Sequence, residues 1–89
     1  MKAVITVLGN DMVGILAKVA DKCAQKNANV IEVSQSVMQD LFAMIMLIDI
    51  GKLNCELAQL TGELTTLGDE LGLKIHVMHE DIFNSMHRI

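Results

Sequence analysis

The middle of the chain decides the fold. Residues 30–50 read VIEVSQSVMQDLFAMIMLIDI, which is two stretches of different pattern around a short polar break. Val30–Val37 alternates between apolar and polar residues, as expected for a strand with one buried face. Leu41–Ile50 is apolar at nearly every position, as expected for a strand buried on both faces. Residues 38–40 leave room for a tight turn, so we predict a β-hairpin.

The segments on either side of this hairpin repeat a strand-and-helix pattern. Lys2–Leu8 is β-branched and apolar and predicts a strand that ends at Gly9, and residues 13–26 carry apolar positions at helical spacing. After the hairpin, leucines recur every three or four residues, and Leu73–Met78 alternates again as a strand. The tail fits one more short amphipathic helix, through Ile82, Phe83, Met86 and Ile89.

The leucine stripe extends from Leu53 to Leu71 and allows two interpretations. A leucine zipper would need a longer run of heptads than this segment contains. A helix packed on a sheet explains the stripe better, with Asn54 predicted to cap its start and Gly72 to end it.

The predicted order is therefore β-α-β-β-α-β with a helical tail, within a single domain covering residues 1–89. This is the α+β, ferredoxin-like arrangement: a four-stranded antiparallel sheet with two helices on one face and a short C-terminal helix. In this topology the first and third strands are central, and these are the two that are apolar on both faces. Two helices cover only one face, so we expect the other face to meet a partner, most economically a second copy of the chain.

The composition excludes several classes of protein. The chain has 89 residues, of which 52% are hydrophobic and 2% aromatic, and its net charge is −4. Disordered chains are poor in apolar residues, and nucleic-acid modules need basic or stacking surfaces. The longest apolar run, Leu41–Ile48, is far too short to span a membrane, and no signal peptide is recognisable. Cys23 and Cys55 match no metal or redox spacing, so we expect reduced thiols and a cytoplasmic protein.

Catalytic chemistry has little support in the sequence. His76 and His79 point to opposite faces of an extended strand, which argues against a shared metal ion. Acylphosphatase-like chemistry on this fold would need an arginine in a phosphate-binding loop, and the one arginine is Arg88, near the C-terminus. We therefore expect no catalytic residue, no metal ligand and no cofactor.

One segment suggests ligand binding: the loop Gly9-Asn10-Asp11-Met12-Val13-Gly14 between the first strand and the first helix. Gly9 is expected to let the chain reverse sharply, and Gly14 to allow close backbone approach. Free N–H groups at a helix N-terminus attract a carboxylate or another small anion. An ordinary strand-to-helix connection, with Asp11 favoured near a helix start, explains the same residues equally well.

The pattern Gly9-x-Asp11-x-x-Gly14-Ile15-Leu16 resembles the opening signature of ACT domains, which are small regulatory βαββαβ modules. Asn29-Val30-Ile31 resembles the second landmark of these domains, and the tail Ile82–Ile89 is similar to that of small free-standing ACT proteins. Many members carry basic residues beside the aspartate, where this chain has Asn10 and Met12.

The resemblance implies a regulatory domain that binds an amino acid or a similar small effector at the interface of a homodimer, paired through its sheet face or edge. The implied ligand-binding residues are the six of the loop, Gly9, Asn10, Asp11, Met12, Val13 and Gly14, with Asn29 facing them. A free-standing domain of this kind would signal through a regulated partner protein. The alternative function is a protein–protein interaction module whose loop is purely structural.

Overall fold

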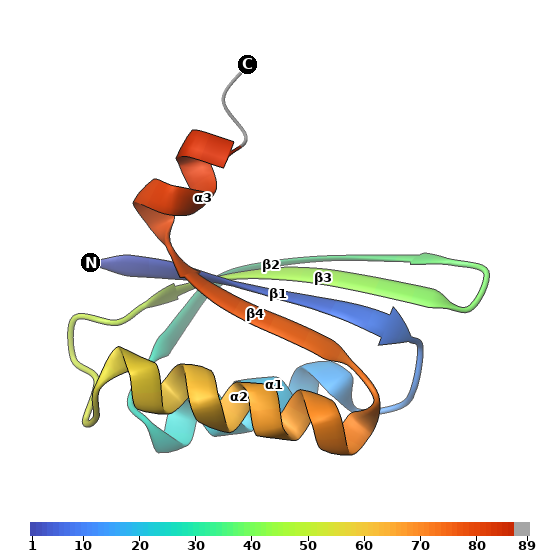
Figure 1. Ribbon diagram of the computed structural model, residues 1–89, viewed down its shortest axis with the longest axis horizontal. Coiled ribbons are helices and arrows are strands. Elements are labelled where there is room, and N and C mark those ends of the chain that lie inside the picture. Colours follow the sequence, from blue (N-terminus) through green and yellow to red (C-terminus); the bar gives the residue numbers. More distant parts are fainter. Residues whose placement is uncertain (87–89) are drawn as a thin grey trace.

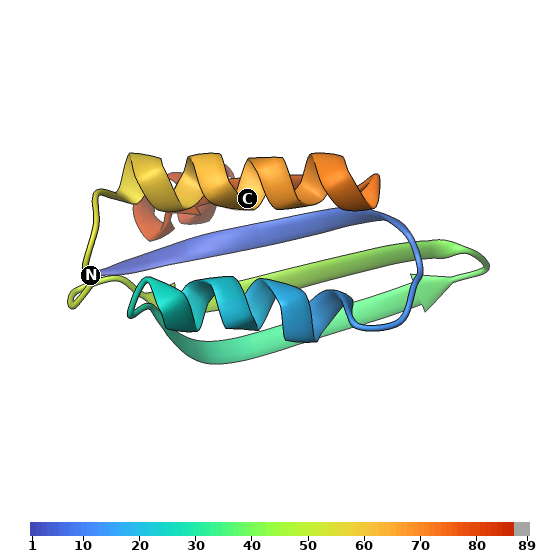
Figure 2. The same ribbon diagram turned by 90° about the horizontal axis from the view of Figure 1, so that it is seen from below.

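Four strands form one antiparallel sheet with two helices on one face (Figures 1 and 2). The computed structural model describes residues 1–86. The strand order across the sheet is β2-β3-β1-β4, which confirms the predicted α+β, ferredoxin-like fold. The elements follow one another along the chain as β1 Lys2–Asn10, α1 Ile15–Gln25, β2 Asn29–Met38, β3 Leu41–Asp49, α2 Leu57–Leu71, β4 Lys74–His79 and α3 Glu80–Met86.

The two doubly apolar strands are central, as the sequence predicts. β1 and β3 pair over their whole lengths, from Lys2 with Asp49 to Asn10 with Leu41. Every second residue of each strand faces α1 and α2 and is buried in the core. These residues are Ala3, Ile5, Val7, Phe42, Met44, Met46 and Ile48.

Each helix covers the sheet with one stripe of small or aliphatic side chains. On α1 the buried positions are Ile15, Val19 and Cys23, spaced four apart. On α2 they are Leu60, Leu64 and Gly68. None of the helices in residues 1–86 is both long and apolar enough to cross a bilayer.

The start of α2 differs from the prediction. The helix begins at Leu57, with Glu56 in the N-cap position, so Leu53 precedes it although its side chain still packs against the core. Asn54 does not cap the helix, because it lies two residues before the N-cap position; its side-chain amide and its backbone N–H instead donate to the end of α1. They reach the carbonyl oxygens of Gln25 and Lys26, each at 3.1 Å.

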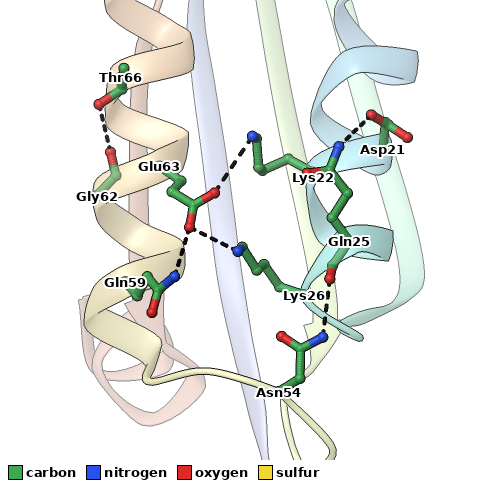
Figure 3. A network of polar contacts seen from close by, with 9 residues as sticks. All are labelled: Asp21, Lys22, Gln25, Lys26, Asn54, Gln59, Gly62, Glu63 and Thr66. Atoms are coloured by element: carbon green, nitrogen blue, oxygen red, sulfur yellow. Dashed lines mark hydrogen bonds and ion pairs between the residues drawn. The ribbon is translucent and has the colours of Figure 1, made fainter.

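A cluster of polar contacts joins α1 to α2 on the outside of the helix layer (Figure 3). The Glu63 carboxylate on α2 accepts from Lys26 at 3.0 Å and Gln59 at 3.1 Å, and it lies 3.5 Å from the Lys22 ammonium. The hydrogen bonds from Lys26 and Gln59 lower the pKa of the Glu63 carboxyl below its usual value. One carboxylate therefore links two lysines of the neighbouring helix.

The sheet face opposite α1 and α2, which we call the open face, is only partly covered. α3 stands on this face at one end of the sheet (Figure 1). Near it Val4 is only 3% exposed, whereas Leu8, Leu41 and Ile45 are exposed. The predicted tail helix is present as α3, described over Glu80–Met86, and Ile89 lies outside the described residues.

Two glycines of α2 give a matched test of this packing. A Cβ on Gly62 would meet nothing within 4 Å, so Gly62→Ala should stabilise the protein by about 0.5–1 kcal/mol through helix propensity. A Cβ on Gly68 would lie 2.8 Å from the carbonyl oxygen of Leu73, so Gly68→Ala should destabilise despite the same gain in propensity. Urea denaturation of the two variants should show shifts of opposite sign, and equal shifts would contradict the close approach of α2 to β4.

The Glu63 cluster predicts a pH-dependent stability. Because the pKa of Glu63 is lower in the folded protein, the cluster stabilises the fold above the unfolded-state pKa of about 4.3 and loses this effect as the pH falls through the folded value. Glu63→Gln should therefore lower the urea midpoint at pH 7, and the difference from the parent should shrink towards pH 3. Glu70→Gln, an exposed change on the same helix, is the control and should show no such trend.

Candidate functional site

The loop between β1 and α1 is held against the turn between β2 and β3. β1 extends through Gly9 to Asn10, two residues further than predicted. The backbone N–H of Asp11 then donates to the carbonyl oxygen of Asp40 at 2.9 Å. In Figure 2 this loop and the β2–β3 turn lie at the same end of the sheet. The loop is thus anchored on both sides, by the strand and by the turn.

The roles predicted for the two glycines are exchanged in the structure. A Cβ on Gly9 would lie 2.5 Å from Cδ2 of Leu73 and 3.3 Å from the carbonyl oxygen of Gly72, so Gly9 provides the close approach. Gly14 has φ +88°, and the nearest atom to a Cβ added there would be Cε of Lys18, at 3.9 Å. Gly14 therefore provides the left-handed backbone that turns the chain into α1.

A hollow of about 360 Å³, the loop hollow, opens beneath this loop and beside β2. Three of the predicted binding residues line it: Asp11, Met12 and Gly14. Gly9, Asn10 and Val13 do not, and the side chain of Val13 is 97% exposed to solvent. The remaining lining residues were not predicted and are Ile15, Leu16, Ala17, Gln35, Val37 and Phe42.

The N-terminus of α1 opens into the loop hollow. No side chain caps this helix, and its first turn contains no acidic residue. The N–H groups of the first turn have no acceptor within the helix, and the helix dipole adds partial positive charge there. Ile15, Leu16 and Ala17 all line the hollow. This end of the hollow is thus suited to an anionic group, while the Asp11 carboxylate lines it as well.

Asn29 does not face the loop within one chain. β1 and β2 are both antiparallel to β3, so they run in the same direction. Asn29 begins β2 and pairs with Asp49, whereas Val37, near the loop, pairs with Phe42. At about 3.3 Å per residue the two positions are roughly 25 Å apart.

Asn29 instead belongs to a second hollow, of about 410 Å³, at the opposite end of β2. We call it the turn hollow. Asn27, in the left-handed conformation at φ 61°, donates from its side chain to the carbonyl oxygen of Lys52 at 2.7 Å and holds this region together. The residues lining the turn hollow are Ala24, Asn27, Ala28, Asn29, Asp49 and Lys52.

A larger hollow, of about 450 Å³, lies on the outside of the helix layer around Glu63 and Gly62. Its central carboxylate is already matched by Lys22 and Lys26. The loop hollow, by contrast, has an uncapped helix terminus and a carboxylate, that of Asp11, with no ion pair among residues 1–86. In residues 1–86 no three metal-ligating side chains come together, and both cysteines are free thiols. We therefore take the loop and turn hollows as the candidate site.

Comparison with known proteins places this geometry in a family. The ACT domain profile matches residues 2–78. A UPF0237 protein of Methanococcus maripaludis is 50% identical over 86 residues, covering 97% of this chain and 96% of that protein. An ACT domain protein from Streptococcus pneumoniae superposes with a TM-score of 0.80 at 34% identity, over 93% of each chain. The regulatory subunit of aspartate kinase from Thermus thermophilus shares the fold, with a TM-score of 0.65 at 22% identity over 85% of this chain and 49% of that one.

Gly14 gives the test of the loop geometry. Gly14→Ala should destabilise the protein by about 1–2 kcal/mol, because a Cβ disfavours the left-handed backbone. Gly14→Asn should cost less, since asparagine tolerates this conformation. Chemical denaturation of both variants measures the difference, and an alanine variant as stable as the parent would show that the loop can turn into α1 in another way.

Proposed function

The chain belongs to the ACT domain family, and from this membership we propose that it is a non-catalytic regulatory protein that binds an amino acid across the interface of a homodimer. The observation that carries the proposal is the position of the loop hollow and the turn hollow at opposite ends of the same edge strand, β2. A second copy can bring these two half-sites together, although one chain alone separates them.

β2 is well suited to pair with another copy. It is ten residues long, contains no proline or lysine, and carries a single charged residue, Glu32. Edge strands that must stay unpaired usually carry proline, lysine or several charged side chains. Its side chains on the helix side are also incompletely covered, with Val33 38% and Val37 53% exposed. An antiparallel β2–β2 pairing would extend the sheet and bury these residues.

Such a pairing has a two-fold axis perpendicular to the sheet. The axis sets the start of one β2 beside the end of the other, so Asn29 of the partner subunit comes next to Val37 and the loop hollow. The turn hollow of one copy then adjoins the loop hollow of the other. Each dimer gains two equivalent composite sites, and in each of them Asn29 faces the loop, as the sequence resemblance implies.

The chemistry of the composite site suits a zwitterion. The first-turn N–H groups of α1 receive the ligand carboxylate, and the Asp11 carboxylate receives its ammonium group. The side-chain amide of Asn29 of the partner subunit can donate to the ligand carboxylate or accept from the ligand ammonium group. Met12, Leu16 and Val37 offer apolar contact to the body of the ligand.

Binding without catalysis is the simplest role for these residues. Burial raises the pKa of the Cys23 thiol to about 11, so this sulfur stays protonated and a poor nucleophile. The free thiols fit a reducing compartment, and we place the protein in the cytoplasm. Its signal would then pass to a regulated partner protein. The second candidate, an interaction module without a small ligand, is favoured by the exposed apolar residues of the open face.

Calorimetry against the twenty standard amino acids tests the proposal. At least one should bind to the parent protein, and Asp11→Ala or Asn29→Ala should weaken that binding by roughly tenfold or more, the usual worth of a hydrogen bond to a charged group. Asp69→Ala, an exposed change on α2, should leave binding unchanged. Absence of binding by every amino acid would contradict the proposal and favour the interaction module.

Mixing the two variants tests whether the site is shared between copies. In a mixed dimer, one composite site carries both substitutions and the other carries neither. An equal mixture of Asp11→Ala and Asn29→Ala chains should therefore regain about a quarter of the parent's sites once the copies exchange. A site contained in one chain would regain none.

A further inference from the structure

The open face exposes an apolar surface at the end of the sheet away from α3. Val7 and Met44 pair and face the helices, so the neighbouring pair Leu8 and Ala43 lies on the open face. Leu8 is 47% exposed and Leu41, two residues from Ala43 along β3, is 46% exposed. Ile45, which is 43% exposed, continues this surface to the middle of the sheet, where it also lines the hollow beneath α3. Exposed aliphatic side chains that gather on one face in this way are typical of an interaction surface.

α3 presents a second apolar surface at the other end of the same face. Phe83 and Glu80 line a hollow of about 200 Å³ together with Val4 and Leu47, which is how the helix rests on its own sheet. Ile82 and Met86, spaced four apart on one side of the helix, are 55% and 65% exposed. Within the described residues α3 comprises seven, and such a short helical segment needs tertiary contacts to persist.

We propose that a second copy covers the open face, with Ile82 and Met86 of each copy packed on Leu8, Leu41 and Ile45 of the other. A two-fold axis that runs parallel to the sheet and across the strands, midway between the two copies, exchanges the two ends of the open face. It brings the helix-bearing end of one copy over the uncovered end of the other. The surface therefore contains both halves of one interface, which is the requirement for a self-complementary contact. A different partner protein would need only one of these two halves, so the presence of both favours a second copy.

The charged residues of β4 and α3 support the same axis. Lys74 pairs with Leu8 at the uncovered end of the open face, whereas Glu80 and Asp81 follow His79, which pairs with Ala3 at the opposite end. Exchange of the two ends therefore sets Lys74 of each copy near the first turn of α3 in the other. Opposite charges at the rim of an interface fix its orientation and suppress other partners.

The middle of the interface carries little charge to desolvate. The row of open-face residues through the centre of the sheet is Ser34, Ile45, Thr6 and His76, none of them a carboxylate. Glu32, on the open face of β2, lies at the end covered by α3, beside Val4 and Leu47 in the hollow. Each chain carries a net charge of −4, which opposes association. In the middle of this interface, however, the two copies meet over neutral and apolar side chains.

This contact does not depend on the β2 edge pairing of the proposed function. The edge axis is perpendicular to the sheet, and the open-face axis runs parallel to the sheet between the two copies. Two perpendicular two-fold axes that intersect generate a closed tetramer with dihedral symmetry. If both contacts form, the assembly is this tetramer; if only the open-face contact forms, it is a dimer.

Charge reversal in two separate chains tests the contact. Val33→Lys, near the middle of β2, is introduced first to remove edge pairing, because it sets like charges against each other across the edge axis. In this background, Lys74→Glu alone and Glu80→Lys/Asp81→Lys alone should each weaken self-association by roughly tenfold or more, because like charges then meet. An equal mixture of the two chains should associate into mixed dimers, since opposite charges meet again at both ends of the interface.

Native mass spectrometry with one chain isotopically labelled counts the mixed dimers, and sedimentation gives the dissociation constants. Lys18→Glu, the same change of charge on α1, is the control and should leave association unchanged. Leu41 is exposed, so an aspartate there can stay in solvent in the single chain. Leu41→Asp, added to both charge-reversed chains, should therefore abolish the mixed dimer. The proposal is overturned if the single-chain variants associate as well as their background, or if the mixture forms no mixed dimers.

Discussion

The pairing of β1 with β3 is the constraint on which the rest of the structure depends. The two strands are matched residue for residue from Lys2 and Asp49 to Asn10 and Leu41. Both are apolar on both faces, so neither can lie at an edge without exposing a full row of aliphatic side chains. A slip of one residue would turn the buried rows of both strands away from the helices, which strongly specifies the register. The same register sets the β1–α1 loop beside the β2–β3 turn, where the Asp11 N–H reaches the Asp40 carbonyl.

The fold could be predicted because each element carries its own periodicity. Alternation in Val30–Val37, the apolar run of Leu41–Ile50 and the leucine stripe of α2 are all local patterns, and the ferredoxin-like topology follows from their order. The start of α2 could not be predicted in the same way. Asn54 has the usual chemistry of a helix cap, yet the helix begins three residues later, and Asn54 donates to the end of α1, a partner that no local pattern reveals.

The candidate site was predictable only in the residues that share one loop. Glycine spacing led to Asp11, Met12 and Gly14, whereas Gln35 and Phe42 come from strands far along the chain. Gln35 did leave a signal, because it interrupts the apolar side of an alternating strand. The exchanged roles of Gly9 and Gly14 left none, since the atom that crowds Gly9 belongs to Leu73. The position of Asn29 was implicit in the topology, because two strands antiparallel to the same neighbour begin at the same end of a sheet.

The placement of acidic residues bears on where copies of this chain can meet. Carboxylates are frequent on the outer surface of the helix layer, at Asp21, Glu56, Glu63, Asp69 and Glu70. Along β2 there is one, Glu32, and none lies in the central row of the open face. Association through β2 and through the open face would therefore keep the helix layers, with five of the chain's eleven acidic residues, in contact with solvent. Symmetry alone would then close such an assembly, with the mixed charges of the helix layers on its outside.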